Sequence, residues 1–312
     1  MNSENPYKVL LYYKYQKIVN PQEFVQQQKI FCEKHNISGR IIIAKEGING
    51  TCAGSPESTK AYMDYMHSLP GFENLWFKVQ NIEHIPFKKL QIRERKEIVT
   101  SGIHNIYPET GSENLSPEEV NSMWEQGAKD GSVIFFDVRN EIESKLGRFK
   151  NAITTKIEFF RELPHVIDQY VHLKDKKIVL YCTGGIRCEK ASVLFKKKKF
   201  KDVYQINGGI YNYCKQFPNK YFEGTCFVFD DRMQICFEKN KIEQIEKEKE
   251  ISDDKIISHC DFCDAKTKRV VNDERNNGHH LVLCCEDCDK KLDVSRVRFK
   301  RKNMKKIMDN FE

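Results

Sequence analysis

Short stretches of alternating apolar and polar residues open the chain, with one helical pattern between them. KVLLYYKY (8–15) and GRIIIA (39–44) alternate as strands do, and the segment 21–35 spaces its apolar residues as a helix does. The first 44 residues therefore predict a strand, a helix and a second strand.

The same order returns in the following segment. Glycines in EGINGTCAG (46–54) suit a tight turn and hairpin, Ser55 followed by Pro56 is typical of a helix start, and 75–85 alternates like a strand. The combined order, β-α-β-β-α-β, predicts a ferredoxin-like (acylphosphatase-like) α+β sandwich over residues 1–100.

The rest of the chain divides by composition. Residues 101–120 are rich in Gly, Pro, Ser and Asn, which favours a linker leading into a capped helix. Residues 121–225 then alternate strands and helices, in the order VIFFDVR, PHVIDQYVHL, KIVLYC, Ile186 to Phe200 and VYQI. This order predicts a parallel α/β sheet whose strand-to-helix turns carry the chemistry.

The C-terminal extension, residues 226–312, has a different character. A strongly charged stretch from Asn240 is either an exposed helix or a flexible connector, and a small cysteine-rich module follows it. We find no internal repeat long enough to indicate a solenoid.

Composition narrows the class of protein. With 312 residues, 39% hydrophobic and 31% charged, the chain is long enough for two or three globular domains. It has no apolar run near the roughly 18 residues of a membrane helix and no export signal at its start, so we expect a soluble, cytoplasmic protein that does not bind a membrane. In that compartment, twelve cysteines indicate metal binding and thiol chemistry more than disulfides.

The formal charge of +7 adds a hint about partners, because basic residues gather in two places. One is the run from Lys196 to Lys199. The other is near the C-terminus and comprises Arg296, Arg298, Lys300, Arg301, Lys302, Lys305 and Lys306. Such clusters suit a polyanionic partner, although a solvated helix face is the plainer interpretation.

One loop carries the clearest chemical signal. Cys182 ends the apolar run KIVLY and is followed by Thr183, Gly184, Gly185 and Ile186 before Arg187. Backbone N–H groups and a helix N-terminus then converge on the sulfur, and Arg187 adds a positive charge, so we expect a low thiol pKa and a reactive thiolate. The alternative is an inert buried thiol, which needs no such glycine-rich cradle.

The other cysteines outside the C-terminal module give weaker signals. Cys188, six residues beyond Cys182, is a candidate to resolve an oxidised or persulfidated Cys182, but a packing role fits it better. Core packing is also the better interpretation for the cysteines without a paired spacing, which are Cys32, Cys52, Cys214, Cys226 and Cys236.

The C-terminal module contains two CxxC pairs, Cys260/Cys263 and Cys285/Cys288, with 21 residues between them. This spacing, slightly beyond the usual roughly 15 to 20, predicts a zinc-ribbon-like site with structural zinc and four thiolate ligands. Cys284 is an alternative to Cys285, and His259, His279 or His280 can replace one thiolate. The plainer alternative is a set of reduced, unligated cysteines.

The central segment resembles the rhodanese superfamily. DVRNEIESKLGRFKNAI, which contains Asp137 and Arg139, matches the first signature of that family, and YCTGGIRCEKAS and INGGI match its active-site loop and its final turn. The resemblance implies a supporting role for Asp137 and Arg139 and a persulfide intermediate on Cys182. Four residues between Cys182 and Arg187 fit sulfur transfer, whereas the related phosphatases use a loop one residue longer.

The whole chain resembles a narrower family. GRIIIAKEGINGTCAG, the rhodanese motifs, INGGIYNY and the pairs CDFC and CCEDC occur in the order found in the bacterial oxygen-dependent tRNA uridine hydroxylases. The resemblance implies oxidation of the wobble uridine of tRNA to 5-hydroxyuridine, with molecular oxygen as co-substrate. Lys45, Glu46 and Asn49, at a strand end, are then candidates to reach the nucleotide, although Glu46 and Asn49 can equally serve to shape the turn.

The sequence does not explain how oxygen would be activated, because it shows no flavin, haem or facial-triad iron site. It also identifies no electron or sulfur donor. Cys182 or its persulfide can add to C6 of uracil and make C5 electron-rich enough to meet oxygen. The sequence also allows two other functions. The protein could be a thiosulfate or persulfide sulfurtransferase, or a non-enzymatic binding scaffold with a vestigial rhodanese domain.

Overall fold

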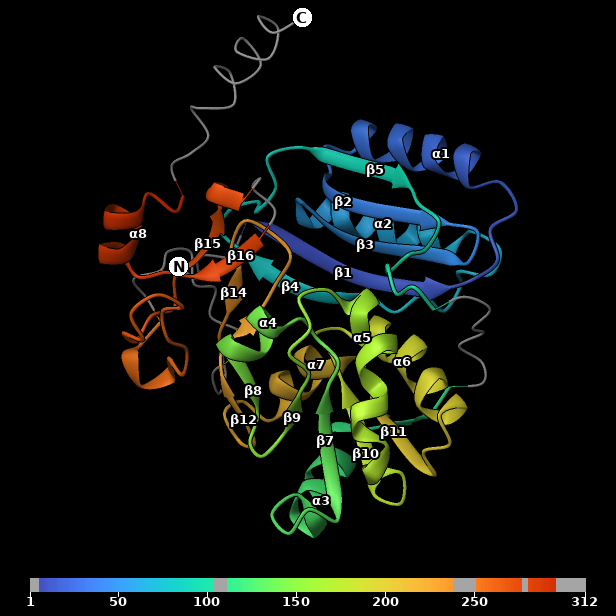
Figure 1. The fold of residues 1–312 in the computed structure, drawn as a ribbon. Helices are drawn as coiled ribbons and strands as arrows, with labels where there is room; N and C mark the ends of the chain where they lie inside the picture. The colour runs from blue at the N-terminus through green and yellow to red at the C-terminus, as the bar shows by residue number, and fades with distance from the viewer. Residues whose placement is uncertain (1–5, 104–110, 238–250, 277–279, 296–312) are drawn as a thin grey trace, which may run out of the picture.

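The computed structural model describes residues 6–103, 111–237, 251–276 and 280–295. The basic C-terminal residues from Arg296 onward, His279 and most of the charged stretch after Asn240 lie outside these ranges. An N-terminal sheet lies against a second α/β unit, and a smaller C-terminal part packs beside both (Figure 1). No helix within the described ranges is long and apolar enough to cross a membrane.

The N-terminal unit has the predicted ferredoxin-like order with one strand added. Its elements are β1 (Tyr7–Tyr15), α1 (Pro21–Lys34), β2 (Ser38–Ala44), β3 (Gly47–Gly54), α2 (Pro56–His67), β4 (Lys78–Ile82) and β5 (Leu90–Glu94). The sheet order is β4-β1-β3-β2-β5, in which β5 runs parallel to β2 as an unpredicted edge strand. Both helices are capped by side chains, Asn20 before α1 and Ser55 before α2.

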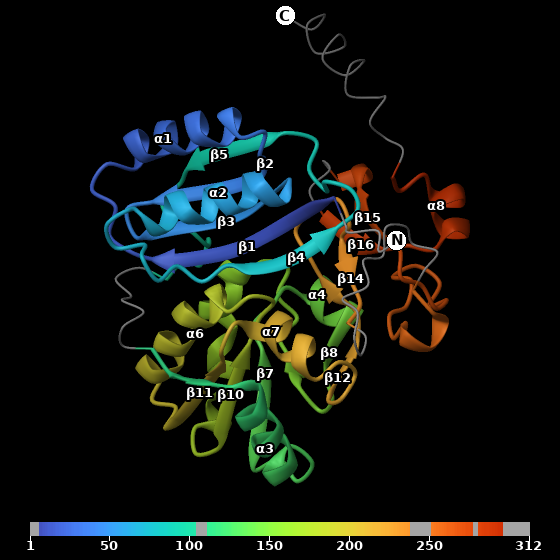
Figure 2. The ribbon, with the colours of Figure 1, turned by 180° about the vertical axis from the view of Figure 1, so that it is seen from behind.

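One face of this sheet is covered by α1 and α2, and the other face packs against the second unit. Leu10 and Tyr12 of β1 are buried in the core beneath α1 and α2, where Tyr12 Oη lies 2.5 Å from Tyr62 Oη. Because side chains alternate along a strand, Leu11, Tyr13 and Tyr15 leave by the opposite face. Seen from behind, β1 and β4 run along the top of the second unit (Figure 2).

The second unit is a parallel sheet with helices on both faces. It contains β6 (Glu113–Leu115), α3 (Pro117–Gly127), β7 (Val133–Asp137), α4 (Glu141–Leu146), β8 (Gly147–Phe149), β9 (Ile153–Thr154), α5 (Leu163–Val166), β10 (Lys177–Tyr181), α6 (Ile186–Lys197), β11 (Asp202–Ile206) and α7 (Gly209–Gln216). The sheet order is β6-β11-β10-β7-β9, with a separate apolar core on each face. The parallel α/β prediction is confirmed.

Two details differ from the sequence predictions. The stretch predicted as a linker contains β6, which pairs with β11 at the edge of the second sheet, because Leu115 can bury its side chain in that core. The predicted helix 164–173 forms only one α-helical turn, α5, and continues as a 3₁₀ helix over Ile167–Leu173.

The C-terminal part consists of short elements: β12 (Phe222–Gly224), β13 (Cys226–Phe227), β14 (Gln234–Ile235), β15 (Val270–Asp273), β16 (His280–Leu283) and α8 (Glu286–Leu292). β12 pairs with β8 and β15 with β16. The first pairing ties the extension to the second unit, and the β15–β16 hairpin carries the second cysteine pair at its end.

The basic run Lys196–Lys199 lies at the C-terminal end of α6, whereas Cys182 precedes the N-terminal end of that helix. Lys198 pairs with Asp168 (2.7 Å), and Lys196 Nζ donates to the Gly111 carbonyl (2.5 Å). A 12-residue helix is about 18 Å long, so this run is separated from the Cys182 loop by the length of α6.

Candidate active site and metal centre

The loop at Cys182 joins the central strand β10 to α6. Gly185 has a φ of +104°, in the left-handed region that favours glycine, and its N–H donates to Cys182 Sγ over 3.1 Å. The loop carbonyls point away from the sulfur: those of Cys182 and Thr183 accept from the N–H groups of Ile210 and Tyr211 at the start of α7 (2.9 and 3.0 Å). The backbone amides are thereby left free to face the sulfur.

The second glycine of INGGI explains why α7 can come so close. Gly209 has a φ of +68°, and a Cβ there would lie 2.4 Å from the Cys182 carbonyl oxygen. A side chain at this residue would therefore push α7 off the loop, so the two glycine motifs of the second unit form one assembly.

The Cys182 thiol is fully buried yet ionises readily. Burial raises its pKa, but the hydrogen bond from the Cys188 thiol, the Arg187 charge and backbone N–H groups outweigh burial and lower the pKa from 9.0 to about 5. Burial and the same hydrogen bond raise the pKa of Cys188, which is therefore the neutral donor. At neutral pH Cys182 is a thiolate, the nucleophilic form, which supports a reactive role over an inert one.

Arg187 is held by a carboxylate from another segment. Its Nη1 and Nη2 bind Glu143 Oε1 and Oε2 at 2.5 and 2.7 Å, and both side chains are buried. Thr183 Oγ1 also donates to Glu143 Oε2 (3.2 Å). A bidentate pair fixes the plane of the guanidinium, so Glu143 of α4 sets where the positive charge beside Cys182 stands.

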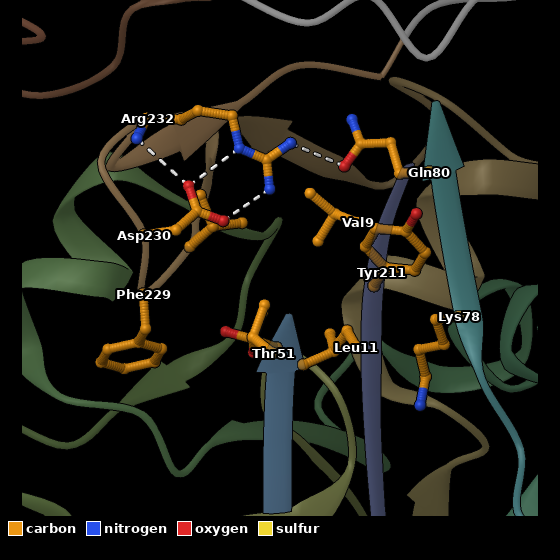
Figure 3. A pocket seen from close by; sticks show the side chains of 11 residues that line it. Val9, Leu11, Thr51, Lys78, Gln80, Tyr211, Phe229, Asp230 and Arg232 are labelled. Atoms are coloured by element: carbon orange, nitrogen blue, oxygen red, sulfur yellow. Dashed lines mark hydrogen bonds and ion pairs between the residues drawn. The ribbon is translucent and has the colours of Figure 1, made fainter. Parts of the chain in front are cut away.

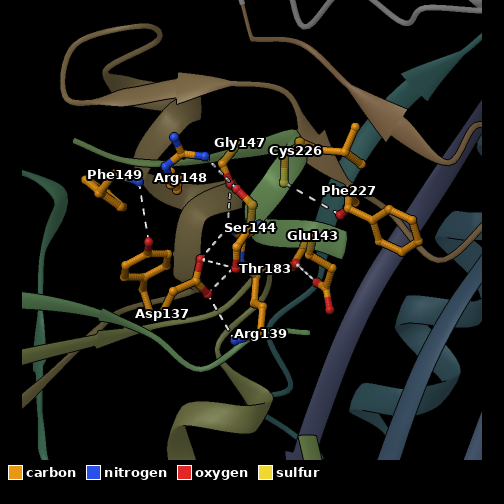
Figure 4. A network of polar contacts seen from close by, with 12 residues as sticks. Asp137, Arg139, Glu143, Ser144, Gly147, Arg148, Phe149, Thr183, Cys226 and Phe227 are labelled. Atoms are coloured by element: carbon orange, nitrogen blue, oxygen red, sulfur yellow. Dashed lines mark hydrogen bonds and ion pairs between the residues drawn. The ribbon is translucent and has the colours of Figure 1, made fainter. Parts of the chain in front are cut away.

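A second buried pair supports the loop from the end of β7 (Figure 4). Asp137 accepts from Arg139 Nε (2.9 Å) and Nη2 (2.6 Å), and from Ser144 Oγ (2.9 Å). Arg139 Nη2 also donates to the Gly147 carbonyl (2.6 Å). These bonds join β7 to α4 and β8 and so position Glu143, which is consistent with the supporting role expected for Asp137 and Arg139.

The three N-terminal candidates have different surroundings. Glu46 Oε1 accepts from Ile98 N–H (2.8 Å) and from Lys190 Nζ (2.9 Å), and Asn49 Nδ2 donates to the Ile98 carbonyl (2.9 Å). Lys45 is exposed beside an open hollow. Glu46 and Asn49 thus hold the segment at Ile98 in place. These contacts favour the interpretation that they shape the turn over the interpretation that they reach the nucleotide.

The same contacts lock the N-terminal sheet onto α6. Lys190 of α6, with only 2% of its side chain exposed, binds both Glu46 and Glu97, the latter at 2.8 Å. Tyr13 Oη donates to Glu189 Oε1 (3.0 Å), and Tyr15 Oη donates to a backbone carbonyl at the start of α6 (3.3 Å). The outward face of β1 therefore covers the Cys182 loop.

A pocket lies where this cover meets the loop (Figure 3). Its volume is about 50 Å³. It is lined by side chains from both units and from the segment after β13, including Leu11, Lys78, Thr183, Tyr211, Phe229 and Arg232. Arg232 is fixed by Asp230 and by Gln80 Oε1 (2.9 Å), whereas Phe229 is about half exposed.

The four cysteines of the CxxC pairs come together. The Sγ atoms of Cys260, Cys263, Cys285 and Cys288 all lie within 4.8 Å of one another, and those of Cys263 and Cys285 are 3.6 Å apart. Tetrahedral zinc with bonds near 2.3 Å would place the sulfurs about 3.8 Å apart, so the set fits that metal. With all four positions provided by protein, such a site is structural.

The alternative ligands that the structure describes, Cys284, His259 and His280, have other partners and are not part of the four-sulfur group. Cys284 is buried and its thiol donates to the Cys285 carbonyl (3.5 Å). His259 Nδ1 is 2.8 Å from the Asp264 carbonyl oxygen, and His280 Nδ1 is 2.8 Å from Glu158 Oε1. The cysteines expected in the core are all buried.

Three residues of the site were not among the sequence-predicted candidates: Glu143, Lys190 and Lys78. Glu143 had a local signal, since it follows Asn140 by three residues as the carboxylate of a capping box and lies inside the first rhodanese signature. Lys190 and Lys78 had none, because their roles depend on how the two units meet.

Comparison with family profiles defines the class of protein. A rhodanese-like domain profile matches residues 116–216, a UPF0176 acylphosphatase-like domain profile matches 7–98, and a rhodanese C-terminal profile matches 223–297. The chain is thus a three-part rhodanese-domain protein.

Full-length relatives narrow this class. The tRNA uridine(34) hydroxylase of Cytophaga hutchinsonii is 38% identical over 92% of this chain and 87% of its own. Those of Streptococcus thermophilus and Staphylococcus aureus are each 39% identical over 91% of this chain, covering 88% and 90% of their own lengths. The chain belongs to the tRNA uridine(34) hydroxylase family.

Proposed function

We propose that this protein hydroxylates the wobble uridine of tRNA at C5 to give 5-hydroxyuridine, with molecular oxygen as co-substrate and Cys182 as the reacting group. The observation that carries the proposal is a buried thiolate of low pKa in a chain whose relatives, matched over nine-tenths of its length, bear that name. We place the reaction in the cytoplasm, with tRNA as the macromolecular partner.

The thiolate supplies the first chemical step. Addition of Cys182 Sγ to C6 of uracil moves the C5=C6 electron pair onto the C4 carbonyl, and the resulting enolate is electron-rich at C5, where it can meet oxygen. Oxygen that gives one atom to C5 leaves the other to be released as water after gaining two electrons and two protons. The reaction therefore consumes a reductant, which neither a cofactor motif nor the described pocket identifies.

The experiment that tests this function is nucleoside analysis of tRNA by mass spectrometry in cells that lack the gene. Wild type should restore 5-hydroxyuridine, and Cys182→Ser should not, because a hydroxyl is not ionised at neutral pH. Cys214→Ala is the matched control, since Cys214 is a buried cysteine of the same unit outside the loop, and it should restore the nucleoside.

Retained 5-hydroxyuridine in Cys182→Ser would reject Cys182 as the reacting group. Transfer of sulfur from thiosulfate to cyanide by the purified wild type, with no effect of the gene on 5-hydroxyuridine, would favour the sulfurtransferase alternative instead. That alternative accounts for the loop but not for the N-terminal sheet that covers it.

We further propose that the four-cysteine cluster holds structural zinc. Cys263→Ser should lower the zinc content of the purified protein and reduce its thermal stability, because the metal replaces a hydrophobic core in so small a module. Cys284→Ala, a change to the neighbouring cysteine outside the cluster, should retain one zinc per chain. Metal analysis gives the result, and loss of zinc in Cys284→Ala but not in Cys263→Ser would reverse the ligand assignment.

A further inference from the structure

Lys78 is a buried cation near the active-site loop that has no part in the thiolate addition described above. It is the first residue of β4, pairs with Leu11 of β1, and lines the pocket beside Thr183 of the active-site loop. Only 5% of it is exposed. Figure 3 shows the Lys78 side chain directed away from the Arg232–Gln80 pair, with Leu11 beside it. Lysine is rarely buried so deeply without a charged partner.

The surroundings of the ammonium are aromatic. Its Nζ lies 4.3 Å from the ring centre of Trp76 and 5.4 Å from that of Tyr13. Among the described residues, no carboxylate and no hydrogen-bond acceptor binds it. Rings attract a cation but leave its N–H groups without acceptors, so Lys78 has donors available for a ligand in the pocket.

Among the described residues, the Cys182 thiolate is a negative charge that acts on Lys78. Burial lowers the pKa of Lys78 to about 8, and the charge of Cys182 opposes this shift. The side chain is consequently still mainly an ammonium at neutral pH. Lys78 and Thr183, the residue that follows the nucleophile, line the same pocket. A cation there is placed to receive negative charge that leaves the nucleophile during reaction.

We propose that Lys78 is a catalytic residue whose ammonium binds O4 of the target uracil and stabilises the enolate formed when Cys182 adds to C6. This inference rests on the proposed function. In the step, the S–C6 bond forms, the C5=C6 π pair moves to become C4=C5, and the C4=O π pair becomes a lone pair on O4. One negative charge passes from sulfur to oxygen, so the step needs no oxidant.

A tRNA phosphate is the other anion that could meet Lys78, and the lining of the pocket argues against it. Val9, Leu11 and Val228 give the pocket apolar walls, which a charged phosphodiester would have to be desolvated to reach. The edge of a planar pyrimidine suits the space better, with the half-exposed Phe229 at its border able to move or to stack on a base.

The test separates this step from the oxygen chemistry. The purified full-length protein is incubated without oxygen at pH 7 with tRNA that carries 5-fluorouridine at the wobble position. Cys182 adds to C6 and C5 takes a proton from water, which leaves a thioether detected by intact mass. Adduct rate and tRNA dissociation constant are measured for wild type, Lys78→Met, Lys78→Arg and Lys88→Met, an exposed-lysine control.

We expect Lys78→Met to form the adduct about 100-fold more slowly, as for loss of one oxyanion donor, with the tRNA dissociation constant changed less than about three-fold. Lys78→Arg keeps the charge and should be intermediate, and Lys88→Met should match wild type. Because Cys182 has a pKa of about 5, it stays ionised at pH 7 when a nearby cation is lost, so the rate reports on the enolate.

The outcomes are distinguishable. Wild-type rates in Lys78→Met, or a loss that follows weakened tRNA binding, would overturn the role of Lys78 and leave the thiolate addition standing. No adduct with wild type would overturn the addition step of the proposed function and the role of Lys78 with it. Removing a buried cation without a carboxylate partner should not lower the unfolding temperature of Lys78→Met, and if it does, Lys78→Arg gives the decisive rate.

Discussion

Glu143→Gln is expected to lose about 3–5 kcal/mol of folding stability and at least about 100-fold in 5-hydroxyuridine formation. Glu143 is the bidentate partner of Arg187, and both side chains are buried. The amide would leave the buried guanidinium without its carboxylate partner, and Arg187 would no longer be held in a fixed position beside the thiolate. Urea unfolding and nucleoside analysis of reacted tRNA measure the two effects.

Glu141→Gln is the matched control, because the change is the same and lies two residues away. The Glu141 side chain is 42% exposed, and within the part of the chain that the structure describes its carboxylate pairs with Lys145 alone, at 3.8 Å, so its loss should cost less than about 1 kcal/mol and leave activity unchanged. Equal stability losses in the two variants would mean that the Arg187–Glu143 pair contributes no more than a surface ion pair.

The second large effect is a rise of stability with pH that depends on Cys182. Its pKa is about 5 in the folded protein against an ordinary value of 9.0. Between these values the unfolded chain binds a proton that the folded chain has released, so stability rises with pH by up to about 1.4 kcal/mol per unit. The contribution is complete above pH 9 and lost as the pH falls through 5.

The measurement compares free energies of unfolding for wild type and Cys182→Ser between pH 6 and 8. Other groups titrate in both proteins, so only the difference between the two curves belongs to Cys182, and we expect that difference to grow with pH in favour of wild type. Parallel curves would show that the thiol ionises near its ordinary pKa and that the cradle does not activate it.

The sequence was a good guide wherever a property is local. The amides around Cys182 and the grouping of the two cysteine pairs follow from short local motifs, and the sequence predicted both. β5 and β6 were missed because a strand of three to five residues at a sheet edge has too few alternating positions to stand out from a loop.

The sequence was a poor guide wherever two units meet. Glu46 looked like a residue at a turn, since its partner Lys190 lies 144 residues further along the chain. Lys78 looked like an ordinary strand lysine for the same reason. The sequence shows which residues have side chains suited to catalysis or binding. Which of them lie close enough to act together depends on how β1 and β4 pack against the loop.

The cover formed by β1 also affects how easily oxidants can reach Cys182. A thiolate with a pKa near 5 is the kind of sulfur that oxidants convert to sulfenic acid when they can reach it. Cys182 has no exposed surface while Leu11, Tyr13 and Tyr15 lie over the loop. The N-terminal sheet therefore helps to keep the resting nucleophile out of contact with dissolved oxidants.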